Sequence, residues 1–169
     1  MTTPIPTADD AVVVRSADAE TLGHPAFLTV RLLTDATATE HALSAVRVTL
    51  AEGVDGATPH HHTGSAELFY VLDGELQVLL GDQVVTAGQG DLVVVPHHLA
   101  HAFGAAPGHT ADLLIVIAPG IDRFEYFRTL ERIAYGTESP DALHEQQERY
   151  DNWFLESPAW QTARATATS

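Results

Sequence analysis

Hydrophobic and polar positions alternate over short runs between residues 11 and 118, and turn-forming residues separate the runs at close intervals. Alternation with a period of two indicates half-buried strands, and many short strands at such spacing are typical of a sandwich or a barrel. We expect strands at 11–15, 26–33, 43–50, 60–62, 67–72, 75–80, 83–86, 91–95, 101–105 and 111–118.

Two dipeptides between these runs predict tight hairpins. Asp73-Gly74 separates YVL from ELQVLL, and Gly81-Asp82 repeats the pattern one strand later. A two-residue type I′ turn needs positive φ at both central positions, which Asp and Gly tolerate better than most residues. The strands on either side of each dipeptide are therefore expected to pair.

The pattern changes to a helical period after Pro119-Gly120, and Gly136 is placed to end the helix. The apolar positions that share one face of this helix are Phe124, Phe127, Leu130 and Ala134. This stripe is expected to cover the outside of the barrel, with a lid or a dimer contact as alternatives.

A second helix is predicted over 139–154, because Ser139 is a suitable N-cap and the proline after it fits the first turn. The large aromatic residues near its end, which would pack on the barrel or on a partner chain, are Trp153, Phe154 and Trp160. The small polar termini, 2–10 and 161–169, are expected to fray.

Length and charge narrow the function classes. The chain has 169 residues, enough for one domain, and a net charge of −15 from 23 acidic and eight basic residues, all eight of them arginine. The absence of lysine excludes Schiff-base and Walker-type phosphate chemistry, and this acidity would repel nucleic acid and anionic membranes. No apolar run approaches the roughly 20 residues of a membrane span, and no secretory signal is visible, so we expect a cytoplasmic protein.

The chain has no cysteine and ten histidines. Disulfides, thiolate nucleophiles and sulfur-ligated metals are therefore excluded. Any metal site must use nitrogen and oxygen ligands, and histidine is the main source of nitrogen.

One histidine-rich stretch carries such ligands. His60 and His62 lie two positions apart, so on an extended strand their side chains point to the same side, while His61 points to the other. After a four-residue loop, Glu67 opens the next strand and can return a carboxylate to that side. Two imidazoles and one carboxylate from neighbouring strands form a two-His, one-carboxylate site with open positions.

A second stretch, GDLVVVPHHLAH, brings a further histidine onto a strand after a proline turn. Together the two stretches resemble the paired motifs of the cupin superfamily. The matching residues are His60, His62, Glu67 and Gly74 in the first motif, and Gly90, Pro96 and His101 in the second.

Three positions depart from the cupin pattern. The leading glycine stands one residue early, at Gly53, which implies a slightly longer entry loop. His98 replaces a glycine of the second motif and would put a side chain in a tight turn near the mouth of the site, and Ala105 replaces an asparagine that is not a ligand. The histidines expected at the surface or rim are His61, His97, His98 and His109.

The resemblance implies an all-β, cupin-type jelly-roll barrel over residues 1–118, followed by a C-terminal α-helical extension over 119–169 that packs on the barrel or on a dimer partner. It also implies a homodimer and one divalent metal ion. The implied metal ligands are His60, His62, Glu67 and His101. These ligands admit Fe, Ni, Mn, Co, Cu or Zn, and one or two free coordination positions would let the metal bind a small molecule.

Three functions are compatible with such a site. The leading one is a dioxygenase of the quercetin-dioxygenase-like cupin type, acting on a chelating phenol, enol or diketone. The alternatives are a zinc-dependent cyclase or isomerase of a polyketide-like substrate, and a non-catalytic cupin that binds or senses a ligand through its metal. In an enzyme, Glu67 could leave the metal and act as a general base, helped by burial that raises its pKa.

Strand parity predicts the wall of the substrate pocket. If Glu67 points inward, Phe69 and Val71 do so too, and the same parity places Phe103 beside the histidine of the second motif. These side chains suit a small organic ligand and would equally serve as plain barrel core. Arg47 could anchor a carboxylate or phenolate, or pair with an acidic neighbour outside the pocket. In so negative a protein, a neutral or metal-chelating substrate is expected rather than a polyanion.

Overall fold

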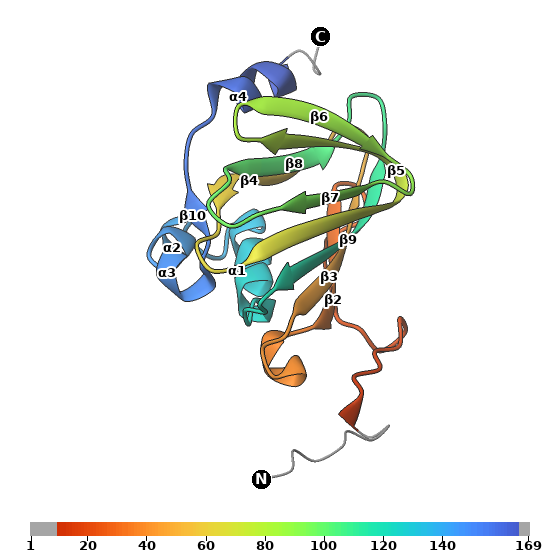
Figure 1. The fold of residues 1–169 in the computed structure, drawn as a ribbon, viewed down its shortest axis with the longest axis vertical. Helices are drawn as coiled ribbons and strands as arrows, with labels where there is room; N and C mark the ends of the chain where they lie inside the picture. Colours follow the sequence, from red (N-terminus) through yellow and green to blue (C-terminus); the bar gives the residue numbers. More distant parts are fainter. Residues whose placement is uncertain (1–9, 166–169) are drawn as a thin grey trace.

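The protein is built on one curled sheet of ten antiparallel strands (Figure 1), and the computed structural model describes residues 10–165. The strands are β1 (Thr21–His24), β2 (Leu28–Thr34), β3 (Ser44–Leu50), β4 (Asp55–His61), β5 (Ala66–Leu80), β6 (Gln83–Gly88), β7 (Leu92–Val95), β8 (His101–Ala105), β9 (Ala111–Ala118) and β10 (Trp153–Phe154). The helices are α1 (Phe124–Ala134), α2 (Asp141–His144), α3 (Gln147–Tyr150) and α4 (Pro158–Ala165), with a 3-10 turn at Ala36–Thr39. The expected all-β barrel with a helical C-terminal region is confirmed.

The long strand β5 joins the two halves of the barrel. Its first half pairs with β7 and β9, so that Glu67 stands opposite Val95 on one side and Ile117 on the other. Its second half pairs with β6 and β8. The sheet order is β1-β2-β3-β9-β5-β8-β4-β10, with β6 and β7 paired to β5 off this path.

The hairpin predicted at Asp73-Gly74 is wrong, because β5 runs straight through this dipeptide. Gly74 has a φ of 75°, and the pairing of β5 with β9 shifts register just before it. The two segments flanking the dipeptide pair with other strands instead of with each other, so tertiary pairing overrides the local turn preference. The hairpin predicted at Gly81-Asp82 is confirmed, since Leu80 pairs with Gln83.

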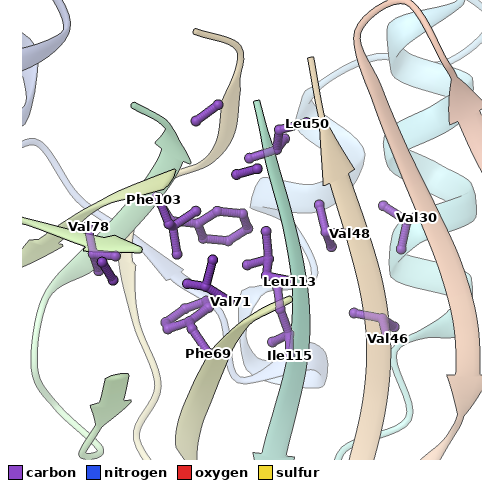
Figure 2. Close-up of a cluster of buried hydrophobic side chains, with 14 of the residues drawn as sticks. Val30, Val46, Val48, Leu50, Phe69, Val71, Val78, Phe103, Leu113 and Ile115 are labelled. Carbon is purple, nitrogen blue, oxygen red and sulfur yellow. The ribbon is translucent and has the colours of Figure 1, made fainter. Parts of the chain in front are cut away.

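The barrel is filled by the inward side chains of β2, β3, β5, β8 and β9 (Figure 2). Its core includes Val30, Val46, Val48, Leu50, Phe69, Val71, Val78, Phe103, Leu113 and Ile115. The centroids of the Phe69 and Phe103 rings lie 5.2 Å apart, which links β5 to β8. Full burial of one such side chain stabilises the fold by about 1.5–3 kcal/mol.

The strand predicted at 11–15 is wrong. Val12, Val13 and Val14 are exposed and form no ladder with the described residues. β-branched residues favour extended backbone, but a strand also needs a partner and a buried face. The edge position is taken by β1, which pairs with β2 and was not predicted.

The first predicted helix is confirmed as α1, whereas the single helix predicted over 139–154 is wrong. That segment forms the short helices α2 and α3, and then β10, in which Trp153 pairs with His61 of β4. Asp151 adopts the left-handed conformation, with a φ of 45°, and so ends α3 and turns the chain toward the barrel.

The fraying predicted over 161–169 is wrong for residues 161–165, which belong to α4. This helix lies beside β6 (Figure 1), and its Trp160 is buried in a small cluster with Leu79 and Ala102. Arg164 donates hydrogen bonds to the carbonyl oxygens of Gly53 and Ala105. The other residues expected to fray, 2–9 and 166–169, lie outside the described part of the chain. None of the helices in residues 10–165 has the length and hydropathy to span a bilayer.

Candidate metal centre and cavity

Four buried side chains converge inside the barrel from three neighbouring strands. His60 lies on β4, opposite His101 at the start of β8, and β8 in turn pairs with β5, which carries Glu67. His62 follows one residue after the end of β4. One ligand atom from each of the four residues lies within 4.8 Å of the others, and each residue is at most 5% exposed. The structure therefore brings together the ligand set that the sequence indicates.

Each imidazole is oriented by a backbone carbonyl on its far side. The Nδ1···O distances are 2.7 Å for His60 and Thr58, 2.6 Å for His62 and Asp151, and 2.8 Å for His101 and Leu99. A carbonyl oxygen only accepts hydrogen bonds, so Nδ1 of His60 and Nδ1 of His101 carry the proton and donate it. Nδ1 of His62 does the same when it pairs with the Asp151 carbonyl, although the Arg123 guanidinium also lies 3.0 Å from it. In a neutral ring, the lone pair on Nε2 then faces Glu67, which is the form in which histidine binds a metal.

The carboxylate of Glu67 stands where these lone pairs converge. Its Oε2 lies 2.7 Å from Nε2 of His101, 3.0 Å from that of His62 and 3.9 Å from that of His60. With neutral rings, no proton lies between these atoms, and the four acceptors repel one another. A cation among them removes the repulsion, and three borderline nitrogen ligands with one hard oxygen suit a divalent transition metal. This buried cluster can thus bind one metal ion.

Burial lowers the pKa of His60 from 6.5 to about 4, against the opposing effect of Glu67. The ring is therefore neutral at pH 7, as a metal ligand must be. Its lone pair is available without prior loss of a proton.

The expectation that burial raises the pKa of Glu67 is wrong in net direction. Burial does raise it, but in the metal-free site hydrogen bonds from imidazoles that take up a proton on Nε2 lower it by more, and the pKa lies well below its usual range. Glu67 is therefore a carboxylate at neutral pH. Since an efficient general base has a pKa near the working pH, this environment favours a ligand role.

The loop that carries His62 is held in place by Asp151 from the C-terminal region. The Asp151 carboxylate accepts hydrogen bonds from the backbone N–H groups of Thr63 and Gly64 at 2.7 and 2.8 Å, and from the Trp153 indole at 3.1 Å. Its own carbonyl accepts the His62 proton. One residue thus fixes both the loop and the ring.

A cavity of about 170 Å³ opens beside the four donors, and His60 and Glu67 form part of its wall. Its apolar wall includes Val46, Val48, Phe103, Phe124, Phe127 and Leu130. An apolar cavity of about 150 Å³ holds a benzene molecule, so this space suits a one-ring or short-chain compound. Three residues of the α1 stripe, Phe124, Phe127 and Leu130, were expected on the outside of the barrel and line this cavity instead.

The predicted pocket residues fall in three different places. Phe103 lines the cavity. Phe69 and Val71 are fully buried in the barrel core and do not contribute to the cavity wall. Arg47 also lies away from the cavity, because it points to the other side of β3 and forms an ion pair with Asp112.

Three polar residues of the cavity wall were missed by the sequence reasoning. Arg123 and Asn152 are 5% and 3% exposed, and Arg123 Nη2 lies 3.0 Å from Nδ1 of His62. Tyr126 joins them, and burial raises its pKa to about 12, so its hydroxyl stays neutral. One feature could have pointed to Arg123: it directly precedes α1, where the helix dipole disfavours a cation.

The remaining histidines lie outside the centre. His97, His98 and His109 are exposed, as expected, and His61 is half-buried with its ring 6.5 Å from that of His98. His98 has a φ of 67°, so a non-glycine residue does occupy the tight turn of the second motif. Its N–H donates to the His62 carbonyl at 2.6 Å.

The barrel and its three-histidine, one-glutamate cluster define a protein of the cupin class. Residues 46–117, which contain all four donors, match the family described as Cupin domain. This part of the chain, from β3 to β9, is therefore a cupin domain. No curated protein matches it in sequence.

Solved structures share the fold at low sequence identity. An RmlC-like cupin from Shewanella frigidimarina has a TM-score of 0.54 and 21% identity, covering 67% of this chain and 93% of that one. A predicted oxalate decarboxylase from Thermotoga maritima has a TM-score of 0.56 and 21% identity, covering 63% and 97%. The iron(II) form of HppE has a TM-score of 0.55 and 21% identity, covering 66% and 62%.

Proposed function

We propose that this chain is a metal-dependent enzyme acting on a small organic substrate, and specifically a dioxygenase of the quercetin-dioxygenase-like cupin type. The observation that carries the proposal is that His60 and Glu67 belong both to the buried donor cluster and to the cavity wall. A metal bound only to brace the barrel would need no opening to a cavity. Metal-dependent chemistry on this fold is also in keeping with the iron(II) form of HppE.

The cavity limits the size of the substrate. A volume of about 170 Å³ holds one ring or a short chain completely, whereas a three-ring flavonol would extend out of it. The proposed substrate is therefore a chelating enol, phenol or diketone with a single ring or a short chain.

The chain's own residues would hold the metal, shield the substrate from water and orient it. A redox-active metal, when bound, supplies the site where O2 and a chelating substrate meet, and both oxygen atoms enter the product without an external reductant. The three histidines and Glu67 would hold that metal. Phe103, Phe124 and Phe127 exclude water from the substrate and pack against its apolar part.

The test begins with elemental analysis of protein purified without chelator, followed by measurement of O2 consumption. The substrates are one-ring catechols, short diketones and cyclic enols, with a flavonol as the size control. We expect about one Fe, Mn, Ni, Co or Cu per chain and O2 uptake with a small substrate. His101→Ala should abolish both, whereas Arg47→Gln, outside the cavity, should leave both intact.

Two other results would replace the dioxygenase with its alternatives. Zinc without O2 uptake, together with conversion of a polyketide-like compound, would favour a cyclase or isomerase. Tight ligand binding without turnover under any metal would favour a non-catalytic binding protein.

A further inference from the structure

Two polar side chains in the cavity wall are buried with donors left over. Arg123 and Asn152 line the cavity together with His60 and Glu67. Arg123 Nε and Asn152 Nδ2 have no hydrogen-bond acceptor within residues 10–165. An unpaired buried donor is unfavourable by about 1–3 kcal/mol, so two in one wall indicate a ligand that brings the acceptors.

The Arg123 guanidinium contacts carbonyl oxygens instead of carboxylates. Its Nη2 donates to the Tyr150 carbonyl at 2.7 Å and lies 3.3 Å from that of Asp151. The Asp151 carboxylate is occupied by the loop after β4, and the carboxylate of Asp35 binds the backbone N–H groups at the start of α1. Neither forms an ion pair with the guanidinium among the described residues.

Burial lowers the pKa of Arg123, and the negative charge of Glu67 gives the largest of the opposing effects, ahead of Asp151 and Asp35. A divalent metal held by three neutral histidines would take over the Glu67 carboxylate. Asp35 also lines the cavity, so a divalent metal, Glu67, Arg123 and Asp35 together then carry one net positive charge. Buried charge without compensation is strongly unfavourable, so an anion is favoured there.

We propose that the cavity binds a small organic carboxylate, whose oxygens accept hydrogen bonds from Arg123 and Asn152 while its apolar part packs against Phe103 and Phe124. This inference rests on the proposed function and narrows its substrate class. The net charge of −15 belongs to the whole chain and points to a neutral substrate, whereas the charge at the cavity has the opposite sign. The positive charge at the cavity, and not the net charge of the chain, determines that the cavity favours an anionic ligand.

The test measures the binding of matched probes to the zinc-loaded protein, in which redox turnover does not occur. Benzoate fits the volume of the cavity, and benzyl alcohol is its neutral counterpart. We expect calorimetry to give a dissociation constant at least tenfold lower for benzoate than for benzyl alcohol. Arg47→Gln removes an arginine that lies outside the cavity, in contrast to Arg123, and should preserve this preference.

Substitutions of Asn152 separate ligand binding from folding. Asn152→Asp places a carboxylate at the same position and should reduce the preference for benzoate at least tenfold. Asn152→Leu replaces an amide whose Nδ2 has no partner among the described residues with an apolar group of similar size, so it should weaken benzoate binding severalfold while Tm is unchanged or higher. Arg123→Lys keeps the charge but loses Nε, and it should weaken benzoate binding with metal content preserved.

Equal affinity for benzoate and benzyl alcohol would overturn the inference, as would a preference that survives both Asn152→Asp and Arg123→Lys. A carboxylate preference without turnover under any metal would remove the enzymatic proposal and leave this inference standing. Substrate-dependent O2 uptake without a preference for benzoate would support the enzymatic proposal and overturn this inference.

Discussion

His61 and His62 are adjacent in the sequence but their side chains have different surroundings. His62 is 1% exposed and its Nε2 faces Glu67, whereas His61 is half-buried and lies near His98. His61 is the last residue of β4 and His62 directly follows it, and the alternation of side chains between opposite faces of a strand continues over this step.

We predict that His62→Ala and His101→Ala each reduce bound metal from about one per chain to near zero, because each removes one of four ligands. His61→Ala is the matched control and should retain the metal. Elemental analysis measures the metal, and circular dichroism verifies the fold. Equal metal loss in all three variants would contradict the ligand assignment.

Acid should destabilise the metal-free protein. The pKa of His60 falls from 6.5 to about 4 on folding, so the unfolded chain binds the proton first as pH decreases. The associated stability is complete above about pH 6.5 and is lost as pH approaches 4, with a magnitude of up to about 3 kcal/mol. The lowered pKa of Glu67 adds a loss in the same direction at lower pH. Urea unfolding of chelator-treated protein between pH 7 and pH 4.5 measures the effect, and His60→Gln should flatten it.

The ligand residues could be predicted from the sequence, whereas their polar neighbours could not. His60 and His62 lie two positions apart, so strand periodicity places them on one face. Glu67 and His101 lie on other strands, and the resemblance to the cupin motifs implied that they complete the ligand set. Arg123 and Asn152 reach the same cavity only because α1 packs on the barrel and β10 pairs with β4. Those contacts depend on tertiary structure that no local pattern records.

At the scale of elements, β5 shows how local turn chemistry can mislead. Asp-Gly between two apolar runs favours a hairpin, but here Gly74 allows one strand to pass close to the Thr110 carbonyl. The apolar runs on either side of Asp73-Gly74 correctly predicted extended strand. The sequence did not indicate which other strands these runs pair with.

We predict that Gly74→Ala destabilises the fold by about 2–4 kcal/mol, because a Cβ there would lie 2.0 Å from the Thr110 oxygen. Gly108 has nearly the same φ, 74° against 75°, and a Cβ at that position would meet no atom of residues 10–165 within 4 Å, so Gly108→Ala is the control. The free energy of unfolding of this control variant should fall only by the strain of an alanine in the left-handed conformation, about 1–2 kcal/mol. Chemical denaturation compares the two, and equal losses would mean that the close approach does not matter.

At the scale of the whole molecule, the region after β9 completes the cavity. α1 supplies an apolar wall, β10 adds to the sheet beside β4, and Asp151 holds the loop that carries His62. The domain boundary at residues 118 and 119, the homodimer and the cytoplasmic location stay predictions. The molecular mass in solution tests the homodimer.

Metal removal should lower the thermal stability of the whole barrel. A ligand present at 100 times its Kd stabilises the folded state by about 2.7 kcal/mol, which at this chain length raises Tm by about 5–10 °C. Calorimetry of EDTA-treated protein before and after addition of Zn²⁺ measures the shift. His101→Ala should show no such shift, and an unchanged Tm in the unsubstituted protein would argue against a metal at the four donors.

The bond between His62 and the Asp151 carbonyl also bears on biosynthesis. The two residues are 89 positions apart. At about 5–20 residues per second, a ribosome adds the second roughly 4–18 seconds after the first. During that interval the nascent barrel holds His62 without its orienting acceptor, so we expect stable metal incorporation to follow translation of the C-terminal region.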